Sequence, residues 1–273
     1  MASTFPFNDW QTFRDAQAIK RLLSPLQWLV AITDWPQVTD WQTAAQQLNV
    51  WELIGRYLIF THEDKLGQRA KRKRKAMARD QTDRAMGRVS SRTYESAIME
   101  KSEIPFRSSD LHDFFNAIIW LNFPRAKFAL HQRAFAIQTM WSQLYDQGRR
   151  CPLADRLTCF DEGGIILDLP QGLGRGQVEP LIQGRDDDAK HSFYQLYAGS
   201  FTLFGHGVME VLMKRPGAIH ASCIILDPGP GSVDERLSKY LDAFDDQTPD
   251  HGAINISWLF AAKKTTSPAD EVG

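Results

Sequence analysis

The sequence has no long hydrophobic run and little cysteine. No stretch approaches the roughly 20 apolar residues that span a bilayer, and the first residues lack the basic start and apolar run of a secretory signal. Three cysteines, Cys151, Cys159 and Cys223, form neither a C-x-x-C pair nor a zinc-binding spacing. These absences argue against a membrane protein and a disulfide scaffold, and they predict a cytoplasmic protein with reduced thiols.

Excess charge is lacking over the whole chain but is present locally. The 273 residues carry a formal net charge of −1. The segment Lys65–Arg92, however, contains eleven basic and two acidic residues, a net charge of +9, which leaves −10 for the remainder. Such a segment is typical of a solvated helix or mobile loop that docks on an acidic surface, and also of an arm that binds nucleic acid. It lacks the interleaved aromatic residues that stack on bases.

The pattern of apolar residues predicts an α+β fold that is predominantly helical, with a small β-sheet in the second half. We expect a single domain over 1–273, with a flexible basic segment at 65–92 and a frayed tail at 265–273. From residue 110 onward we expect helices over 110–123, 125–145, 200–213 and 232–244. We expect strands over 157–160, 165–169 and 221–226, with a hairpin turn over 161–164 and a loop over 170–190.

One expected helix carries polar residues on an otherwise apolar surface. The segment SDLHDFFNAIIWLNF is apolar around its whole circumference, which is typical of a buried helix. His112 and Asn116 share one face at spacing i, i+4, with Asp113 beside them. A buried polar group without a partner costs about 1–3 kcal/mol, so this face must meet other polar groups, a ligand or water. Both a structural polar network and a functional site fit the pattern.

The second unusual segment is FTLFGHGVMEVLM, in which His206 lies between Gly205 and Gly207. A glycine inside a helix costs about 1 kcal/mol relative to alanine, so these glycines indicate close approach of another backbone or of a ligand. Glu210 lies one turn after His206 and could orient its imidazole or hold a metal with it. Tight helix packing, with His206 bonded to Asp113 or Asn116, is the alternative.

Other candidates are weaker. His131 could join the two histidines, but a single histidine on an apolar stripe is more often a core residue. Asp161 and Glu162 form a possible carboxylate pair, although adjacent acids before two glycines usually form a turn. The sequence contains no P-loop, no G-x-S-x-G elbow and no H-E-x-x-H motif.

Four segments together are similar to a known family: YESAIMEKSEIPFR, LHDFFNAIIWLNFPRAKFALH, LTCFDEGGIIL and FTLFGHGVMEVLM. They resemble the bacterial domain-of-unknown-function family DUF3025. The residues that match its pattern include His112, Asp113, Asn116, Lys127, Asp161, Glu162, His206 and Glu210. Leu111, Ala126 and Gly207 stand where the family usually has Trp, Thr and Ala. The resemblance implies a bacterial cytosolic protein and no particular activity.

Two hypotheses follow. The first is a small hydrolase in which His112 and His206 face each other, with Asp113, Asn116 and Glu210 orienting them or completing the shell of a divalent metal. The second is a binding protein in which the buried polar cluster is structural and Lys65–Arg92 contacts nucleic acid or an acidic partner.

The second hypothesis predicts a steep dependence of binding on salt. If Lys65–Arg92 neutralises phosphates, affinity for a generic RNA or DNA duplex falls by orders of magnitude when salt rises from about 50 to about 200 mM, because each phosphate contact releases counterions. A filter-binding titration at several salt concentrations measures this. Absence of binding, or binding without the slope, contradicts the hypothesis.

Overall fold

The computed structural model describes residues 36–62, 92–108, 110–145, 151–214 and 219–257. Helices predominate in these ranges and are accompanied by two small sheets, so the predicted α+β class is confirmed. Except for Arg92, the predicted basic segment at 65–92 lies outside the described residues, as does the tail at 265–273. The binding hypothesis that depends on this segment therefore stays a prediction.

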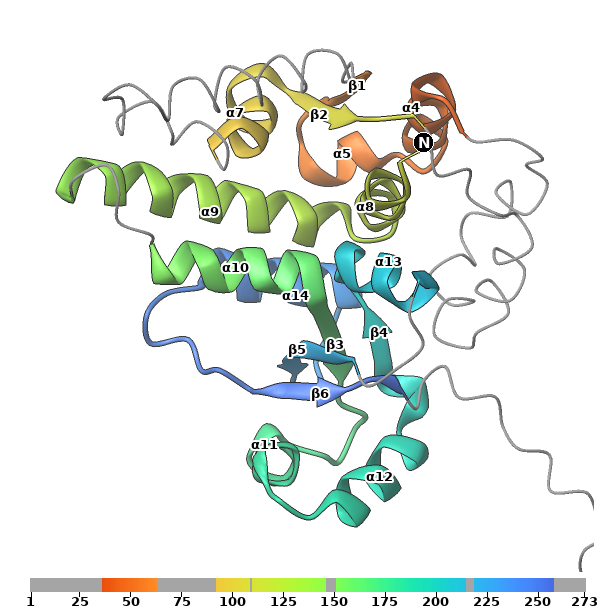
Figure 1. The fold of residues 1–273 in the computed structure, drawn as a ribbon, viewed down its shortest axis with the longest axis vertical. Helices are drawn as coiled ribbons and strands as arrows, with labels where there is room; N and C mark the ends of the chain where they lie inside the picture. Colours follow the sequence, from red (N-terminus) through yellow and green to blue (C-terminus); the bar gives the residue numbers. More distant parts are fainter. Residues whose placement is uncertain (1–35, 63–91, 109, 146–150, 215–218, 258–273) are drawn as a thin grey trace, which may run out of the picture.

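Figure 1 shows three levels. The upper level contains α4 (Val38–Gln47), α5 (Val50–Ile54) and α7 (Arg92–Lys101) around two strands, β1 (Ile59–His62) and β2 (Glu103–Phe106). These strands pair in parallel as a two-stranded sheet, whereas the sequence predicts a sheet only in the second half of the chain. A middle level of helices separates them from the four-stranded sheet below.

Two predicted helices, α8 (Leu111–Asn122) and α9 (Pro124–Leu144), are confirmed. Asp110 caps α8 by accepting a hydrogen bond from the backbone N–H of Asp113. The proline at the start of α9 is favourable there because a first-turn N–H has no helical partner. Nearly every residue of α8 is buried, as its apolar circumference predicts.

The strand predicted over 157–160 and the hairpin turn over 161–164 are wrong. These residues belong to the helix α10 (Pro152–Gly163), which leads directly into β3 (Gly164–Asp168). The buried positions Ala154, Leu157 and Phe160 recur every three residues, which is a helical period. A window of four residues is too short to reveal this period. The two acidic residues, Asp161 and Glu162, lie at the end of the helix.

The single helix predicted over 200–213 is also wrong. Its first part is the strand β4 (Phe201–Leu203), whose outer two residues are buried and which pairs antiparallel with β3. Its second part is α13 (His206–Lys214). Gly205 separates the two elements, so His206 begins a helix instead of lying inside one.

The loop predicted over 170–190 is wrong, because these residues contain the whole of α11 (Arg175–Gln183) and the beginning of α12 (Asp187–Leu196). The short 3-10 helix η1 (Ala198–Ser200) follows α12. The abundance of glycine, proline and aspartate there hid two helix starts. Asp186 caps α12 through the backbone N–H of Ala189.

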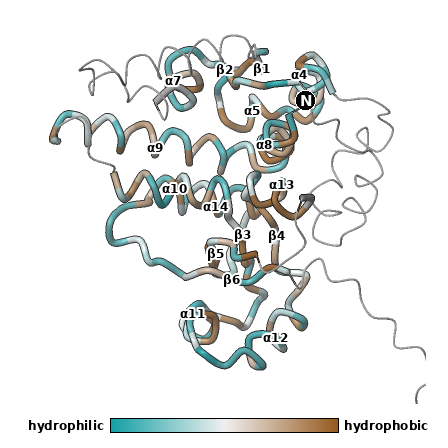
Figure 2. Tube along the Cα trace, in the orientation of Figure 1, coloured by the Kyte–Doolittle hydropathy of each residue, from teal (hydrophilic) through white to brown (hydrophobic). Residues whose placement is uncertain are grey.

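The second-half sheet is confirmed, with strand order β4-β3-β5-β6. The central strands β3 and β5 (His220–Leu226) pair in parallel, and β6 (Ala253–Asn255) pairs antiparallel with β5. The helix predicted over 232–244 is confirmed as α14 (Val233–Asp242), which begins with a capping box of Ser232 and Glu235. Figure 2 shows the apolar residues concentrated in the inner helices and strands, while α11 and α12 present many hydrophilic positions. Within the described ranges, no helix has both the length and the apolarity to cross a membrane.

Close backbone packing joins α13 to the start of β3. A Cβ atom added to Gly205 would lie 2.3 Å from the backbone nitrogen of Gly164 and 2.6 Å from Cα of Gly163. The backbone of Gly205 also donates a hydrogen bond to the carbonyl of Gly164, at 2.8 Å. The sequence-based prediction that this glycine allows close approach of another backbone is therefore confirmed.

Gly205→Ala is expected to destabilise the protein, by about 1–3 kcal/mol or more, because its methyl group would overlap backbone that cannot move independently. Thermal and urea unfolding measure the change. Gly176→Ala, in α11 with nothing near the added Cβ, is the matched control and should be neutral or stabilising. Equal effects of the two substitutions would contradict this account of Gly205.

Candidate functional site

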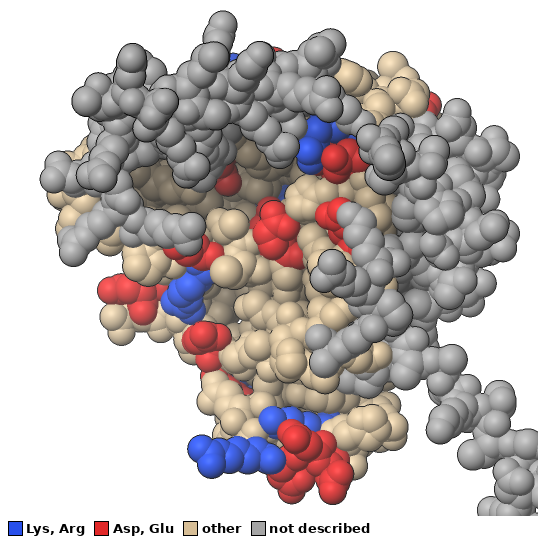
Figure 3. Space-filling view, viewed as in Figure 1, with Lys and Arg blue, Asp and Glu red and all other residues tan. Residues whose placement is uncertain are grey.

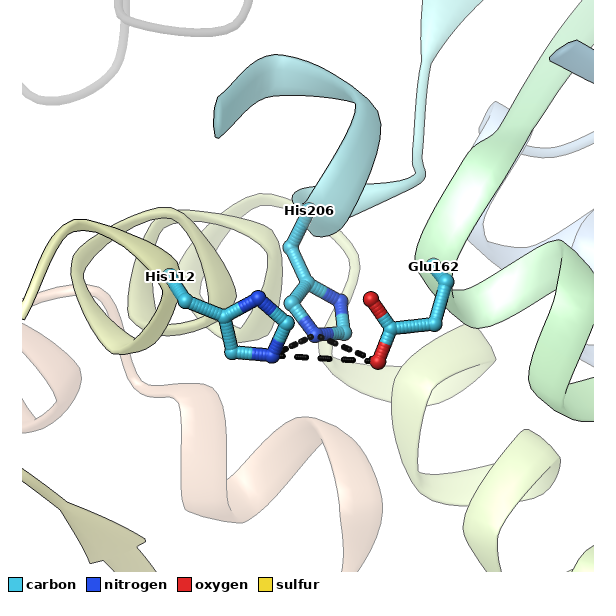
Figure 4. Close-up of side chains that lie close together, drawn as sticks. All are labelled: His112, Glu162 and His206. Atoms are coloured by element: carbon cyan, nitrogen blue, oxygen red, sulfur yellow. Dashed lines mark hydrogen bonds and ion pairs between the residues drawn. The ribbon is translucent and has the colours of Figure 1, made fainter. Parts of the chain in front are cut away.

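Two imidazole rings from different parts of the chain meet at the junction of α8 and α13. His112 lies in the first turn of α8, and His206 is the first residue of α13. Their Nε2 atoms are 3.0 Å apart, and the rings are inclined by 68° (Figure 4). The structure thus brings together the two histidines that the sequence singled out on separate helices.

Glu162, near the end of α10, completes a cluster with these histidines. Its Oε1 atom lies 3.7 Å from Nε2 of His112 and 3.6 Å from Nε2 of His206. The side chain of His206 is 4% exposed, that of His112 30% and that of Glu162 47%. The cluster is therefore closed on the side of His206 and open on the side of Glu162.

Each imidazole directs its other nitrogen toward a second carboxylate. Nδ1 of His112 lies 3.4 Å from Oε2 of Glu210, and Nδ1 of His206 lies 3.8 Å from Oδ2 of Asp161. Both rings are oriented in the same way: Nε2 faces the centre of the cluster, and Nδ1 faces a carboxylate. Carboxylate partners of this kind orient histidines that ligate metals.

Gly207 gives Glu162 its position. A Cβ atom at residue 207 would lie 2.3 Å from Oε2 of Glu162 and 3.0 Å from its backbone carbonyl. Any side chain here would displace the carboxylate from the two imidazoles. Gly207, which stands where the DUF3025 pattern usually has alanine, therefore leaves room for the carboxylate of Glu162 in this chain.

A buried ion pair lies behind the cluster. The Lys127 ammonium, from α9, pairs with Oδ1 of Asp161, and the lysine side chain is fully buried. Burial acts to raise the pKa of Asp161, but Lys127, His206 and His131 lower it well below its ordinary value, so the group is a carboxylate. Burial, reinforced by Lys127, lowers the pKa of His206 well below its ordinary value, which keeps its imidazole neutral near pH 7.

The open side of the site is acidic. Burial raises the pKa of Glu162 above its ordinary value, and the carboxylates of Asp161 and Glu210 add to the rise, while His112 opposes it. Figure 3 shows acidic side chains gathered near the middle of the face viewed, over the region where α10 and α13 meet. A cation would relieve the repulsion between these carboxylates.

The other predicted site residues have different partners. Asp113 accepts three hydrogen bonds from Arg107, one from its backbone N–H and two from its guanidinium, at 2.6–2.8 Å. Asn116 donates to the hydroxyl of Tyr94 at 2.6 Å. The structure therefore places Asp113, in the first turn of α8, in a charged clamp with Arg107 from the segment before that helix. Asn116 makes a polar contact between α7 and α8.

His131, the weaker candidate, lies deeper than the cluster. Its ring stacks on Trp120 with an interplanar angle of 17°. Its Nε2 is 3.9 Å from Oδ2 of Asp161 and its Nδ1 is 3.9 Å from Oε1 of Glu95. It thus approaches the site through Asp161 and not directly.

Interpretation of the sequence missed Asp161, Glu162 and Lys127 as members of the site. The sequence predicts a turn at the acidic pair, because it predicts a strand and not a helix over the residues before it. Two signals were present: the three-residue apolar period of α10, and the membership of all three residues in the family pattern. Lys127 also stands on the buried stripe of α9, where an unpaired ammonium would not be tolerated.

Comparison with known proteins gives a family and nothing closer. The family model described as "Protein of unknown function (DUF3025)" matches residues 81–248, more than half of the chain. No curated protein and no solved structure matches the chain.

A double-mutant cycle tests the clamp of Asp113. Arg107→Met and Asp113→Leu should each destabilise the protein, and the pair together should cost less than their sum by about 1–3 kcal/mol, because the hydrogen bonds join charged groups that are largely shielded from water. Urea unfolding of the four proteins gives the coupling energy. Additive effects would show that the clamp contributes little to stability.

Proposed function

The chain belongs to the DUF3025 family of proteins of unknown function, and we propose from the geometry of its site that it is a metal-dependent hydrolase. One observation carries the proposal. His112, Glu162 and His206 each offer a ligand atom, and the three atoms lie within 4.8 Å of one another. Two histidines and one carboxylate, with positions left for water, are a recurring ligand set of catalytic zinc and iron sites.

The separations support a single divalent ion. With metal–ligand distances of about 2.1 Å, adjacent ligand atoms lie about 3.0 Å apart in octahedral and about 3.4 Å apart in tetrahedral coordination. The observed separations are 3.0 Å between the two Nε2 atoms and 3.6–3.7 Å from these to Oε1 of Glu162. Shifts of a few tenths of an ångström would suffice to bind the ion.

Glu210 distinguishes this arrangement from a simple hydrogen bond between two histidines. Its carboxylate faces Nδ1 of His112 and favours a proton there. The neutral ring then carries a lone pair on Nε2, directed at Nε2 of His206. Without a cation, the 3.0 Å contact requires a proton on one of the two Nε2 atoms. A common cation would take the place of that proton, with both lone pairs directed at it.

The open side supplies the place for the reaction. A divalent ion with free positions lowers the pKa of a bound water to about 7, which makes it a nucleophile at neutral pH. In hydrolysis the hydroxyl of water is added to the acyl carbon, the bond to the leaving oxygen or nitrogen breaks, and the leaving group takes up the proton. The carboxylates of Glu162 and Glu210 favour a neutral ester or amide over an anionic phosphate.

Metal content is the direct test. Protein purified without a histidine tag should contain about one zinc, iron or similar divalent ion per chain by elemental analysis. His112→Ala, His206→Ala and Glu162→Gln should each lower the affinity for Zn²⁺, in a competition titration against a chelating dye, by at least about 10-fold. His220→Ala removes an exposed histidine on β5 and serves as the control.

Catalysis is tested on the same proteins with a panel of chromogenic esters and amides. Activity should disappear with a chelator, return with the ion and be absent from the three ligand variants. Protein without bound metal, together with identical substrate profiles for the wild type and the two histidine variants, would eliminate the proposal. Large losses of stability in those variants, without any effect on metal, would favour a structural cluster.

A further inference from the structure

Asp161 is the point at which three buried side chains converge. Its Oδ1 pairs with Lys127, and its Oδ2 faces both Nδ1 of His206, at 3.8 Å, and Nε2 of His131, at 3.9 Å. We propose that Lys127, Asp161 and His131 form a positioning triad that fixes His206 with its proton on Nδ1 and its Nε2 lone pair toward His112 and Glu162. The role of the triad in metal binding rests on the proposed function, but the proton position on His206 does not.

Lys127 determines how Asp161 is placed. Its side chain has no solvent exposure, and its ammonium lies 5.8 Å from the centre of the Phe204 ring. A buried ammonium requires a carboxylate partner, because water is not there to solvate it. One oxygen of Asp161 is thereby held on the side of α9, and the other is left to face the two imidazoles.

The buried Nδ1 of His206 needs this second oxygen. In the described part of the chain it has no hydrogen-bond partner within normal bonding distance, and Oδ2 of Asp161 faces it at 3.8 Å. A lone pair on Nδ1 would face a carboxylate in a site of low polarity, which is repulsive, whereas an N–H is attracted. The proton therefore belongs on Nδ1, and in the metal-free protein His112 donates the hydrogen bond that joins the two Nε2 atoms at 3.0 Å. The structure assigns to Asp161 the orienting function that Glu210 has beside His112.

His131 holds the same oxygen from the other side. Its ring is stacked on Trp120 and lies 5.1 Å from the ring of Tyr94, so its plane is fixed and its nitrogens are directed at Asp161 and Glu95. Neither nitrogen has a closer hydrogen-bond partner among the described residues. A buried imidazole left in this state is costly unless it engages these carboxylates directly or through water. His131 therefore restrains Asp161. It acts on His206 through this carboxylate.

Nitrogen-15 NMR of the histidine rings in the metal-free protein tests the proton position. The spectrum is assigned with His206→Gln and distinguishes Nδ1–H from Nε2–H forms. His206 should be in the Nδ1–H form in the wild type and should move toward a mixture of forms in Asp161→Asn and, to a smaller extent, in His131→Phe. His251→Phe is the matched control, since His251 is equally buried and faces a carboxylate, Glu179, at 3.1 Å in another part of the fold.

Asp161→Asn leaves Lys127 buried without its charged partner, which is strongly destabilising, so the pair is also replaced as a unit. Lys127→Met/Asp161→Leu removes both charges and keeps the volume apolar, a change that is often neutral for stability. This variant should fold, lose the Nδ1–H form of His206, and bind Co²⁺ about 10- to 100-fold more weakly than the wild type, with a changed visible absorption spectrum. His251→Phe should bind Co²⁺ as the wild type does.

The outcomes separate the two proposals. A wild-type His206 in the Nε2–H form, or an Nδ1–H form that persists in the double variant, overturns the positioning triad whatever the metal affinity. A wild type that binds neither Zn²⁺ nor Co²⁺ overturns the proposed function. In that case the Nδ1–H form and its loss in the double variant still decide whether Asp161 positions His206.

Discussion

A lysine without solvent exposure, paired with Asp161, is the constraint on which the rest of this structure depends. Removal of one partner from a buried ion pair costs about 3–5 kcal/mol, because the other charge is left without compensation. The pair joins the first turn of α9 to the last turn of α10. Since Glu162 follows Asp161 directly, the same pair also determines where the exposed carboxylate of the cluster emerges.

Glycine then determines how closely the third helix can approach. Gly205 brings the start of α13 against the backbone of Gly163 and Gly164, and Gly207 leaves room for Glu162. A Cβ atom at Gly205 would overlap backbone, whereas a Cβ atom at Gly207 would require the carboxylate of Glu162 to shift. The ion pair thus positions the carboxylates, and the glycines position His206 against them, so the cluster arises from two independent packing constraints that meet within a few residues.

Sequence reasoning anticipated the parts of this arrangement that depend on local periodicity. The apolar circumference of α8 and the glycines around His206 pointed to two helices that each carry a buried polar residue needing a partner, and the structure places His112 and His206 side by side. Local patterns could not decide what lies opposite a given residue. The sequence predicts Asp113 beside His112 in the site, but Arg107, which precedes the helix, binds its carboxylate, and Asn116 faces Tyr94. Both partners come from outside α8.

The roles of the carboxylates Asp161 and Glu162 could not be predicted from the local sequence. Their significance depends on being at the end of a helix that faces two other helices, and a dipeptide followed by two glycines does not reveal this. Lys127 gave a usable signal, since a charged residue on the buried stripe of α9 implies a buried partner of opposite charge. Only the fold specifies that this partner is Asp161, 34 positions further along the chain.

The gradient of exposure across the cluster distinguishes it from a polar network that only stabilises a core. A structural network gains most when it is sealed, because its hydrogen bonds are then protected from competition with water. Here the exposed fraction of the side chains rises from 4% at His206 to 30% at His112 and 47% at Glu162. His206 lies against the largely buried, charged Asp161, whereas Glu162 faces solvent. Rigid support behind and access in front are the conditions that a binding or catalytic site requires, and stability alone would not require the open side.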